Sequence, residues 1–394
     1  MNAALLHPRA DIYYWKCDRP AAFYGLSGSA RECPPGELAS TLASALARHF
    51  GERIALAPGS GQGNHLTFTA RIGGHDTFIR VEDGPDGDDY MEVESQVLRA
   101  VARLGVPAPA VLHVDATRRD VPFAWQVLEC IPFPDLNRHW KEGRLDLPRL
   151  ALEIGAHIAR WQSLALGAGY GPFSTELVRT AGELRGYHAS YVDYFHTRLD
   201  RHLAFLVEKS FLTRAQADDL QREIDTHAAL LARPAPCLVP KDLALWNILG
   251  APDRIAAFID FDDAVGGDPL DDISLLGCFH DGATIGRVLA GYATVRPLPA
   301  DYRRRFWLHL LRNMVWKAGW CLLFRTRVAA FLLVPAPAAP ISPPLRLRAS
   351  TPRSVASAPM RIPARSHAPL RPFPPTDHDT LHRHLAFARL ARRR

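Results

Sequence analysis

The feature that most constrains this sequence is a pair of short Asp-containing segments, each of which includes an apolar, strand-like run. In the first, VPKDLALWNIL (residues 239–249), Asp242 lies five residues before Asn247. In the second, IAAFIDFDDAVGGDPLDDISLL (residues 255–276), Asp260 ends the apolar run. We therefore expect two carboxylates and an amide to converge at strand ends. Phosphoryl transfer needs this set, because one carboxylate deprotonates an attacking hydroxyl while an Asn and an Asp hold Mg²⁺ on the phosphates.

Length and composition indicate a soluble protein with room for a cleft between lobes. The chain has 394 residues, which is enough for about two to three domain-sized units. It is 47% hydrophobic and 22% charged, and its apolar runs are too short for a transmembrane helix. The first residues lack the order of regions that marks a secretory signal, so we expect a cytoplasmic protein. The six scattered cysteines include no C-x-x-C spacing, which favours free thiols over a zinc site or a disulfide framework.

The first third of the chain shows an α+β pattern. HLTFTARIGGHDTFIRVED contains two β-rich runs around Gly73 and Gly74, which predicts a hairpin. MEVESQVLRAVARLGVPAPAVL spaces Val97, Leu98 and Val101 as a helix does, and FAWQVLECI returns to strand character. A strand, strand, helix and strand in this order predict an α+β lobe with a small antiparallel sheet.

The rest of the chain changes character twice. From about Leu147 to Phe331 the pattern is mostly helical, which predicts a second, mostly α lobe. After Val334 the sequence is rich in Pro, Ala, Ser and Arg and buries too little apolar surface to fold, so we expect disorder to about Thr376. The predicted domains are an N-terminal extension, a nucleotide-binding N-lobe, a catalytic and acceptor-binding C-lobe, and a Pro/Arg-rich tail: residues 1–45, 46–132, 133–334 and 335–394.

In order and spacing, the two Asp-containing segments resemble the aminoglycoside phosphotransferase and choline kinase-like branch of the protein-kinase-like fold. The signature of that family runs roughly His-Gly-Asp-Leu-x-x-x-Asn-Ile-Leu, then Ile-Asp-Phe or Ile-Asp-Trp, then Gly-Asp-Pro-x-x-Asp. This chain matches it from Asp242 to Asp272, except that Pro240 and Lys241 replace the usual His-Gly. The resemblance implies a bilobal α+β fold with a small antiparallel-sheet N-lobe and a larger, mostly α C-lobe, followed here by a disordered C-terminal tail.

The resemblance also implies roles for the matching residues. Asp242 would be the catalytic base, Asn247 and Asp260 would ligate Mg²⁺, and Asp272 would buttress the catalytic loop. The replacement of His-Gly puts the geometry of this loop in question more than its chemistry. Lys241 is a candidate for supplying positive charge near the transferred phosphoryl group.

A Gly-rich turn precedes the first predicted strand of the hairpin. PGSGQGNHLTFTARI offers Gly59, Gly61 and Gly63, which allow backbone N–H groups to approach phosphates closely. The pair Gly61 and Asn64 fits the Gly-x-x-Asn that the family often has here. An ordinary hairpin turn is the alternative interpretation.

The next strand and the following helix supply a charged pair. Arg80 occupies the position of the phosphate-pairing Lys or Arg in the family, and Glu94 on the helix would hold it, with Glu92 as second choice. An ordinary surface ion pair is the alternative. The segment VLECIPF resembles the hinge between lobes, whose backbone around Glu129 to Ile131 would bind an adenine edge.

Together these features predict a small-molecule kinase that uses ATP or GTP with Mg²⁺ and phosphorylates a hydroxyl of a small acceptor. From Tyr302 to Arg394 there are 18 Lys/Arg and 2 Asp/Glu; this part carries +16, which against +6 overall leaves −10 for residues 1–301. The acidic body, with Asp262, Asp263 and Asp268 close to the catalytic segments, favours a cationic acceptor such as an aminoglycoside. For Asp268 we expect instead a structural role, as the cap of the turn at Pro269. Four aromatic residues either wall the acceptor pocket or form core: Tyr187, Tyr191, Tyr194 and Phe195.

Two other classes of function stay open. The first is a catalytically inactive kinase-like protein that binds a nucleotide or another ligand, and the altered Pro240 and Lys241 favour it. The second is a nucleic-acid-binding module, which rests only on the basic tail.

Overall fold

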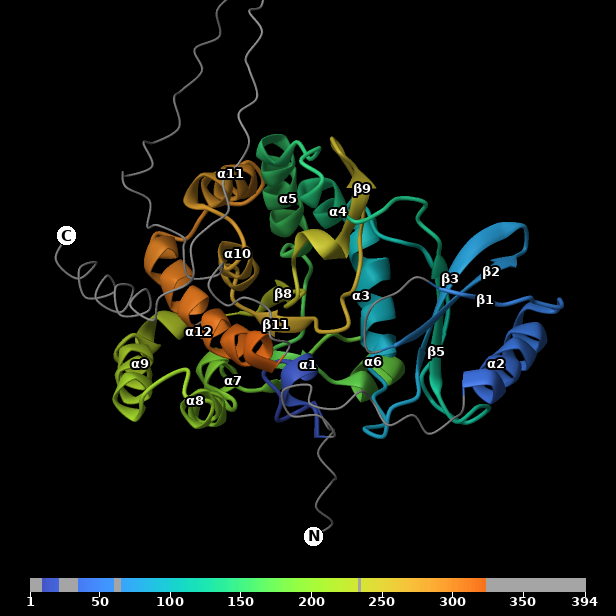
Figure 1. Cartoon of the computed structure of the whole chain (residues 1–394), viewed down its shortest axis with the longest axis horizontal. Helices are drawn as coiled ribbons and strands as arrows, with labels where there is room; N and C mark the ends of the chain where they lie inside the picture. Colours follow the sequence, from blue (N-terminus) through green and yellow to red (C-terminus); the bar gives the residue numbers. More distant parts are fainter. Residues whose placement is uncertain (1–8, 21–34, 60–64, 233–234, 324–394) are drawn as a thin grey trace, which may run out of the picture. The chain divides into compact units, whose positions relative to one another are not determined.

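The computed structural model describes most of the chain (Figure 1). It covers residues 9–20, 35–59, 65–232 and 235–323. The chain divides into two units, Met1–Val334 and Pro335–Arg394, and the second, for which the sequence predicts a largely disordered tail, lies outside the described residues. The predicted phosphate-binding residues Gly61, Gly63 and Asn64 lie outside them as well.

The N-lobe is built on an antiparallel sheet. Within the described residues its order is β1-β2-β3-β5-β4, and the strands are β1 (Ala57–Pro58), β2 (Leu66–Ile72), β3 (His75–Glu82), β4 (Val111–Asp115) and β5 (Ala124–Glu129). β2 and β3 form the predicted hairpin, whose turn residues Gly73 and Gly74 have φ angles of 56° and 82° that glycine adopts without strain. Arg80 lies opposite Thr67 on one side and Gln126 on the other, so a strand paired on both sides holds it.

Two helices cover the sheet in Figure 1, α2 (Pro35–Phe50) on one face and α3 (Met91–Arg103) on the other. α2 buries its leucines in a hydrophobic cluster with the strands. α3 is the helix that the sequence predicts, and its Val97 and Val101 join a core cluster that also contains C-lobe residues. Burying such a side chain stabilises the fold by about 1.5–3 kcal/mol. The core thus fixes the position of α3, and with it that of Glu94.

The C-lobe is mostly helical, as the sequence predicts. Its helices in the described part are α4 (Leu136–Lys141), α5 (Leu147–Trp161), α6 (Thr175–Ala181), α7 (Tyr191–His196), α8 (Leu199–Glu208), α9 (Arg214–Thr226), α10 (Asp271–Gly277), α11 (Gly282–Ala293) and α12 (Tyr302–Leu323). α5 and α11 pack very closely, because a Cβ atom at Gly155 would lie only 1.9 Å from the carbonyl oxygen of Val288. In the part of the chain that the structure describes, no helix has both the length and the apolar character needed to cross a membrane.

Short strands in the C-lobe place the two Asp-containing segments. In the described residues they form a sheet of order β7-β6-β11-β8 and a hairpin of two strands, with bounds β6 (Tyr170–Phe173), β7 (Gly186–His188), β8 (Cys237–Val239), β9 (Ile248–Ala251), β10 (Arg254–Phe258) and β11 (Val265–Gly267). The loop at residues 240–247 joins β8 to β9, and the loop at residues 259–264 joins β10 to β11. Because β8 pairs with β11 and β9 with β10, both loops connect the same two pieces of sheet and lie side by side.

Candidate active site

The loop at residues 240–247 is compact because Asn247 closes it. The side-chain nitrogen of Asn247 donates to the backbone oxygen of Asp242 at 2.8 Å, and its backbone N–H donates to Ala244. Both Asp242 and Asn247 are nearly buried. The five-residue spacing in the sequence therefore corresponds to direct contact between the two side chains that phosphoryl transfer needs.

Asp260 is held in a strained conformation beside this loop. Its φ angle of +65° lies in the left-handed region, which is uncommon for a residue with a side chain. Its neighbours fix it there: the backbone N–H of Ile259 donates to the carbonyl oxygen of Asn247 at 3.0 Å, and that of Phe261 donates to Glu94 at 3.2 Å. Strain of this kind persists where the surroundings determine the position, and it is common at active sites.

Arg80 connects the sheet of the N-lobe to these loops. Its Nη1 atom lies 2.5 Å from Oε2 of Glu94, the partner that the sequence predicts. Its Nη2 atom lies 3.0 Å from Asp262 and 3.3 Å from Asp260. The second candidate, Glu92, contacts Arg179 instead. Because Arg80 and Glu94 are both buried, this is a fixed part of the site and not a surface ion pair.

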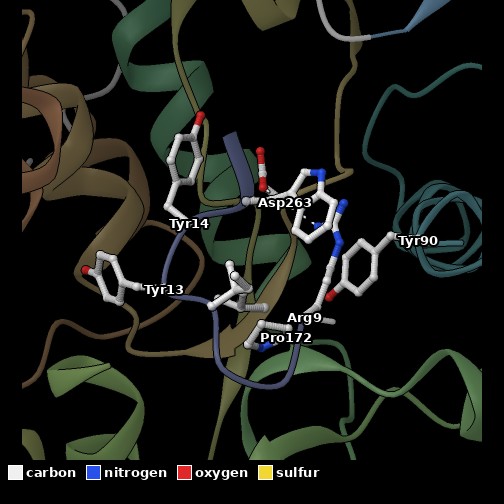
Figure 2. A pocket seen from close by; sticks show the side chains of 9 residues that line it. Arg9, Tyr13, Tyr14, Tyr90, Pro172 and Asp263 are labelled. Carbon is white, nitrogen blue, oxygen red and sulfur yellow. Dashed lines mark ion pairs between the residues drawn. The ribbon is translucent and has the colours of Figure 1, made fainter. Parts of the chain in front are cut away.

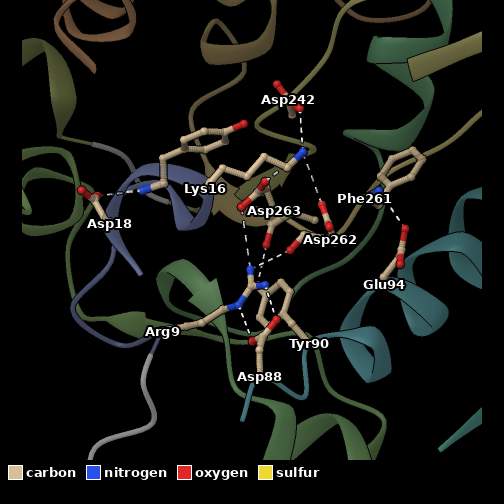
Figure 3. A network of polar contacts seen from close by, with 12 residues as sticks. Arg9, Lys16, Asp18, Asp88, Tyr90, Glu94, Asp242, Phe261, Asp262 and Asp263 are labelled. Atoms are coloured by element: carbon tan, nitrogen blue, oxygen red, sulfur yellow. Dashed lines mark hydrogen bonds and ion pairs between the residues drawn. The ribbon is translucent and has the colours of Figure 1, made fainter. Parts of the chain in front are cut away.

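The structure adds a cation that sequence patterns do not reveal. Lys16, on the short helix α1 (Trp15–Asp18), places its Nζ atom 2.8 Å from Oδ2 of Asp242 (Figure 3). The same atom lies 3.0 Å from Oδ2 of Asp260. Asp263 and Asp262 follow at 3.5 and 3.9 Å. Although burial lowers it, these carboxylates raise the pKa of Lys16 well above its ordinary value, with Asp242 contributing most. Lys16 therefore offsets the mutual repulsion of a cluster of carboxylates.

The segment that carries Lys16 is firmly packed. The side chains of several of its residues are almost completely buried: Ile12, Tyr13, Tyr14, Trp15 and Cys17. Each large apolar side chain contributes about 1.5–3 kcal/mol by burial. A substrate bound with a Kd of about 1 mM supplies only about 4 kcal/mol, so substrate binding is too weak to displace the whole segment. Residues 9–19 are thus a wall of the site.

Arg9 anchors the start of this wall. Its guanidinium group donates to both carboxylate oxygens of Asp88, at 2.8 and 2.6 Å, and to the backbone oxygen of Asp262 at 2.6 Å. It also lies over the ring of Tyr90, 3.9 Å from the centroid. A cavity lined by Arg9, Tyr14, Tyr90 and Asp263, among others, is shown in Figure 2; its volume is only about 10 Å³, which is room for about one water molecule.

Two carboxylates of the cluster differ in their protonation. Burial raises the pKa of Asp263 to about 7, with Lys16 opposing the rise and Asp262 adding to it. Burial acts in the same direction on Asp262, but Lys16, His65 and Arg80 together hold its pKa well below the ordinary value. Asp262 is therefore ionised at neutral pH, whereas Asp263 gains or loses its proton near neutral pH.

His65, directly before β2, bridges the two lobes as a cation. Its Nε2 atom lies 3.1 Å from Asp262 and its Nδ1 atom 3.1 Å from Glu82. Burial and Arg80 lower its pKa, but the contacts with Asp262 and Glu82 outweigh them and raise it to about 9. The sequence analysis assigned no role to this residue, because a single His carries no pattern.

This arrangement predicts a pH dependence of stability. Since the folded-state pKa of His65 exceeds the unfolded value of about 6.5, the ion pairs contribute fully below that pH. The contribution disappears as the pH rises through about 9. We expect the free energy of unfolding in urea to fall by up to about 3 kcal/mol across this range, and His65→Gln to remove most of the slope. His75→Gln, at an exposed position on β3, should leave the slope unchanged; equal slopes in all three proteins would contradict the prediction.

Lys241 anchors the loop at residues 240–247 through buried contacts. It is 1% exposed, its φ angle is +71°, and its Nζ atom lies 2.7 Å from Oδ2 of Asp271 and 4.0 Å from the centroid of the Tyr13 ring. Its backbone N–H donates to Asp272 at 3.2 Å, which fits the buttressing role expected for that residue. The ammonium group is therefore committed to Asp271, and the idea that Lys241 supplies charge to the transferred phosphoryl group is not supported by its position.

Two further groups from the sequence are structural. Tyr191, Tyr194 and Phe195 are at most 1% exposed and form core, the second of the two interpretations, whereas Tyr187 is only half-buried. Asp268 accepts a hydrogen bond from the backbone of Leu270 and pairs with Arg305, and both partners of this ion pair are completely buried.

Some backbone groups of the predicted hinge already form hydrogen bonds within the N-lobe. The backbone N–H of Glu129 donates to Ala110 at 2.8 Å, and that of Cys130 donates to Asp76 at 3.1 Å. The carbonyl oxygen of Ile131 accepts from Phe133 at 2.9 Å. The N–H groups of Glu129 and Cys130 are therefore already hydrogen-bonded within the N-lobe.

The types of residue at the two loops suit Mg²⁺ that is shared with the phosphates of a nucleotide. Among the described residues, no group of three or more His, Cys, Asp or Glu side chains is arranged to hold a metal ion without further ligands. Mg²⁺ in phosphoryl-transfer sites is typically bound by one or two carboxylates together with substrate phosphates. The side-chain nitrogen of Asn247 is used by Asp242, which leaves its amide oxygen as the possible ligand, and the backbone of Asn247 bonds to Ile259, the residue before Asp260.

The fold and these loops define a class of protein, the kinase-like phosphotransferases. Residues 56–317 match the family described as the phosphotransferase enzyme family, APH. Since this match spans more than half of the chain, the chain belongs to that family. No significant match was found among curated proteins.

Solved structures confirm the bilobal fold. A thermostable mutant of aminoglycoside phosphotransferase APH(4)-Ia in its apo form is 20% identical, with a TM-score of 0.54 over 73% of this chain and 94% of that one. A ternary complex of the same enzyme with ADP and hygromycin B is 18% identical, with a TM-score of 0.54 over 74% and 94%. Macrolide 2'-phosphotransferase MphH from Brachybacterium faecium is 18% identical, with a TM-score of 0.50 over 76% and 99%.

Proposed function

We propose that this protein is a small-molecule kinase that transfers the γ-phosphoryl group of ATP or GTP to a hydroxyl group. The observation that carries the proposal is the meeting of Asp242, Asn247 and Asp260 on two adjacent loops, with Arg80 reaching Asp260 from the other lobe. The similar structures support a nucleotide, because the titles of several name ADP or AMP-PNP.

Each residue would act by position and charge. Asp242 accepts the proton of the acceptor hydroxyl, and Asn247 and Asp260 hold Mg²⁺, which neutralises charge on the phosphates. Arg80, kept in place by Glu94, pairs with the phosphates of the nucleotide. In the same proposal the backbone around Gly61, Gly63 and Asn64 covers the phosphates, and the hinge at Glu129 to Ile131 takes the adenine.

The acceptor would be a small, cationic molecule. Residues 1–301 carry a net charge of −10, and a field of this sign attracts cations. Trp246, which is 38% exposed and packs edge-on against Phe279, offers an aromatic surface next to the catalytic loop. In the ternary complexes of APH(4)-Ia the second ligand is hygromycin B, which supports a small-molecule acceptor here.

The test is thermal stabilisation by ATP and by GTP, each with and without Mg²⁺. A ligand that binds only the folded protein stabilises it by about 3 kcal/mol at 100 times its Kd. We expect a shift of the unfolding temperature that depends on Mg²⁺ in the wild-type protein. In Asp260→Asn that dependence should be lost, and in Asp253→Asn, at an exposed turn between β9 and β10, it should remain. The absence of a shift with both nucleotides would favour an inactive ligand-binding protein.

A further inference from the structure

The ammonium group of Lys16 joins the two carboxylates that the proposed function assigns to the acceptor and to the metal. It is 2.8 Å from Asp242, where the acceptor hydroxyl would bind (Figure 3). It is also 3.0 Å from Asp260, where Mg²⁺ and the nucleotide would bind. The γ-phosphoryl group moves from the nucleotide to the hydroxyl, between these two carboxylates. During transfer, Lys16 is therefore either displaced or in contact with the phosphoryl oxygens.

The surroundings of Lys16 argue against displacement of its backbone. Asp18, at the end of α1, lies 2.6 Å from Nε2 of His202, and both residues are completely buried. The ring of Tyr14 packs on Trp316 with a centroid distance of 4.1 Å. Only the Lys16 side chain, which is 15% exposed, has freedom to adjust. The segment holds the ammonium group in the site.

A second lysine is less well placed. The Nζ atom of Lys317 lies 3.8 Å from the other oxygen of Asp242, and it lies between 4.6 and 5.5 Å from the centroids of three aromatic rings. Among the ion pairs of the described residues, only Lys16 joins Asp242 to Asp260. The geometry therefore assigns the contact with the moving group to Lys16.

We propose that Lys16 is a catalytic residue, whose ammonium group donates hydrogen bonds to the γ-phosphoryl oxygens during transfer. This rests on the proposed kinase function. In the step, the acceptor oxygen bonds to the γ-phosphorus while the bond from that phosphorus to the bridging oxygen breaks. The hydroxyl proton goes to Asp242, the nucleoside diphosphate leaves, and Lys16 keeps its protons. Fixed cations at the place where phosphoryl charge spreads are a recurring means of accelerating this reaction.

The test separates binding of the nucleotide from binding of the transferred group. Thermal stabilisation is measured with ADP and Mg²⁺, then with aluminium fluoride added to imitate the phosphoryl group. We expect Lys16→Met to keep the stabilisation by ADP and Mg²⁺ but to lose the increment from aluminium fluoride, which Lys16→Arg retains in part. Mg²⁺-dependent ATP turnover should fall about 100-fold in kcat in Lys16→Met with little change in KM. Lys209→Met, at an exposed surface ion pair, is the matched control and should behave as wild type.

Each result decides the matter. An undiminished aluminium fluoride increment in Lys16→Met would overturn the proposal, and turnover equal to or faster than wild type would show that Lys16 is a bystander or blocks the site. If Lys16→Met does not fold, Lys16→Gln, which keeps a donor without the charge, must show the same loss. If wild type itself shows no stabilisation by ADP and Mg²⁺, the kinase function fails and this proposal with it, so the two failures are distinguishable.

Discussion

Replacing Asp242 with Asn is expected to lower the rate of phosphoryl transfer by about 10²–10⁴-fold, the range that general-base catalysis contributes. The amide has the shape of the carboxylate but cannot accept the hydroxyl proton. Binding of the Mg²⁺-nucleotide should change little, because the proposed metal ligands are Asn247 and Asp260. Asn247 donates to the backbone oxygen of Asp242 at 2.8 Å, a contact that does not depend on the replaced side chain, and the Asn amide oxygen can still accept the longer contact of 3.4 Å.

The measurement combines a transfer assay over hydroxyl acceptors with thermal stabilisation by ATP and Mg²⁺. Asp253→Asn makes the same chemical change at an exposed turn and should leave both readouts unchanged. If Asp242→Asn turns over at the wild-type rate, Asp242 is not the base, and the kinase assignment loses its central residue. If stabilisation by the nucleotide disappears as well, Asp242 is part of the metal site instead.

The parts of the site that the sequence predicted are those set by short spacings. Asp242 and Asn247 touch because five residues are enough to turn one loop back on itself. Arg80 and Glu94 meet because β3 and α3 follow one another directly in the chain and share a core, so a separation of 14 residues still leaves few alternative partners. In both cases local pattern and tertiary packing favour the same contact.

Contacts between distant parts of the chain could not be predicted in this way. Lys16 is 226 residues from Asp242, and no periodicity links a lysine near the N-terminus to a particular carboxylate. The one local sign in the sequence is the aromatic content of residues 11–25, which is typical of a segment that packs on a lobe, and the described part of this segment is buried. β4 (Val111–Asp115) was missed as well, because its residues are mostly half-buried and do not alternate clearly between apolar and polar.

Lys241 illustrates a sequence departure whose physical meaning only the structure shows. Its φ angle of +71° is one that glycine adopts freely, which explains why the family signature has Gly at this position. A lysine here costs backbone strain, and the structure shows a compensating buried ion pair with Asp271. Burial opposes it, but Lys241 keeps the pKa of Asp271 below its ordinary value.

Removing one partner of this pair should therefore be strongly destabilising. Lys241→Met keeps the backbone strain, because Met is also a residue with a side chain, and leaves the carboxylate of Asp271 buried without its cation. We expect the free energy of unfolding to fall by about 3–5 kcal/mol. The double variant Lys241→Met with Asp271→Asn removes both charges and should recover most of the loss, since a buried ion pair often contributes little net stability relative to neutral residues.

Urea unfolding of the wild type, both single variants and the double variant gives the coupling energy between the two side chains. Asp271→Asn alone should also destabilise, because it leaves the Lys241 ammonium buried, although the ring of Tyr13 at 4.0 Å offers it partial compensation. A double variant as unstable as the sum of the singles would show that the ion pair does not couple these residues. If the double variant regains the full free energy of unfolding, Lys241 and Asp271 balance each other's charge. That balance would explain how a backbone conformation that favours glycine accommodates a lysine.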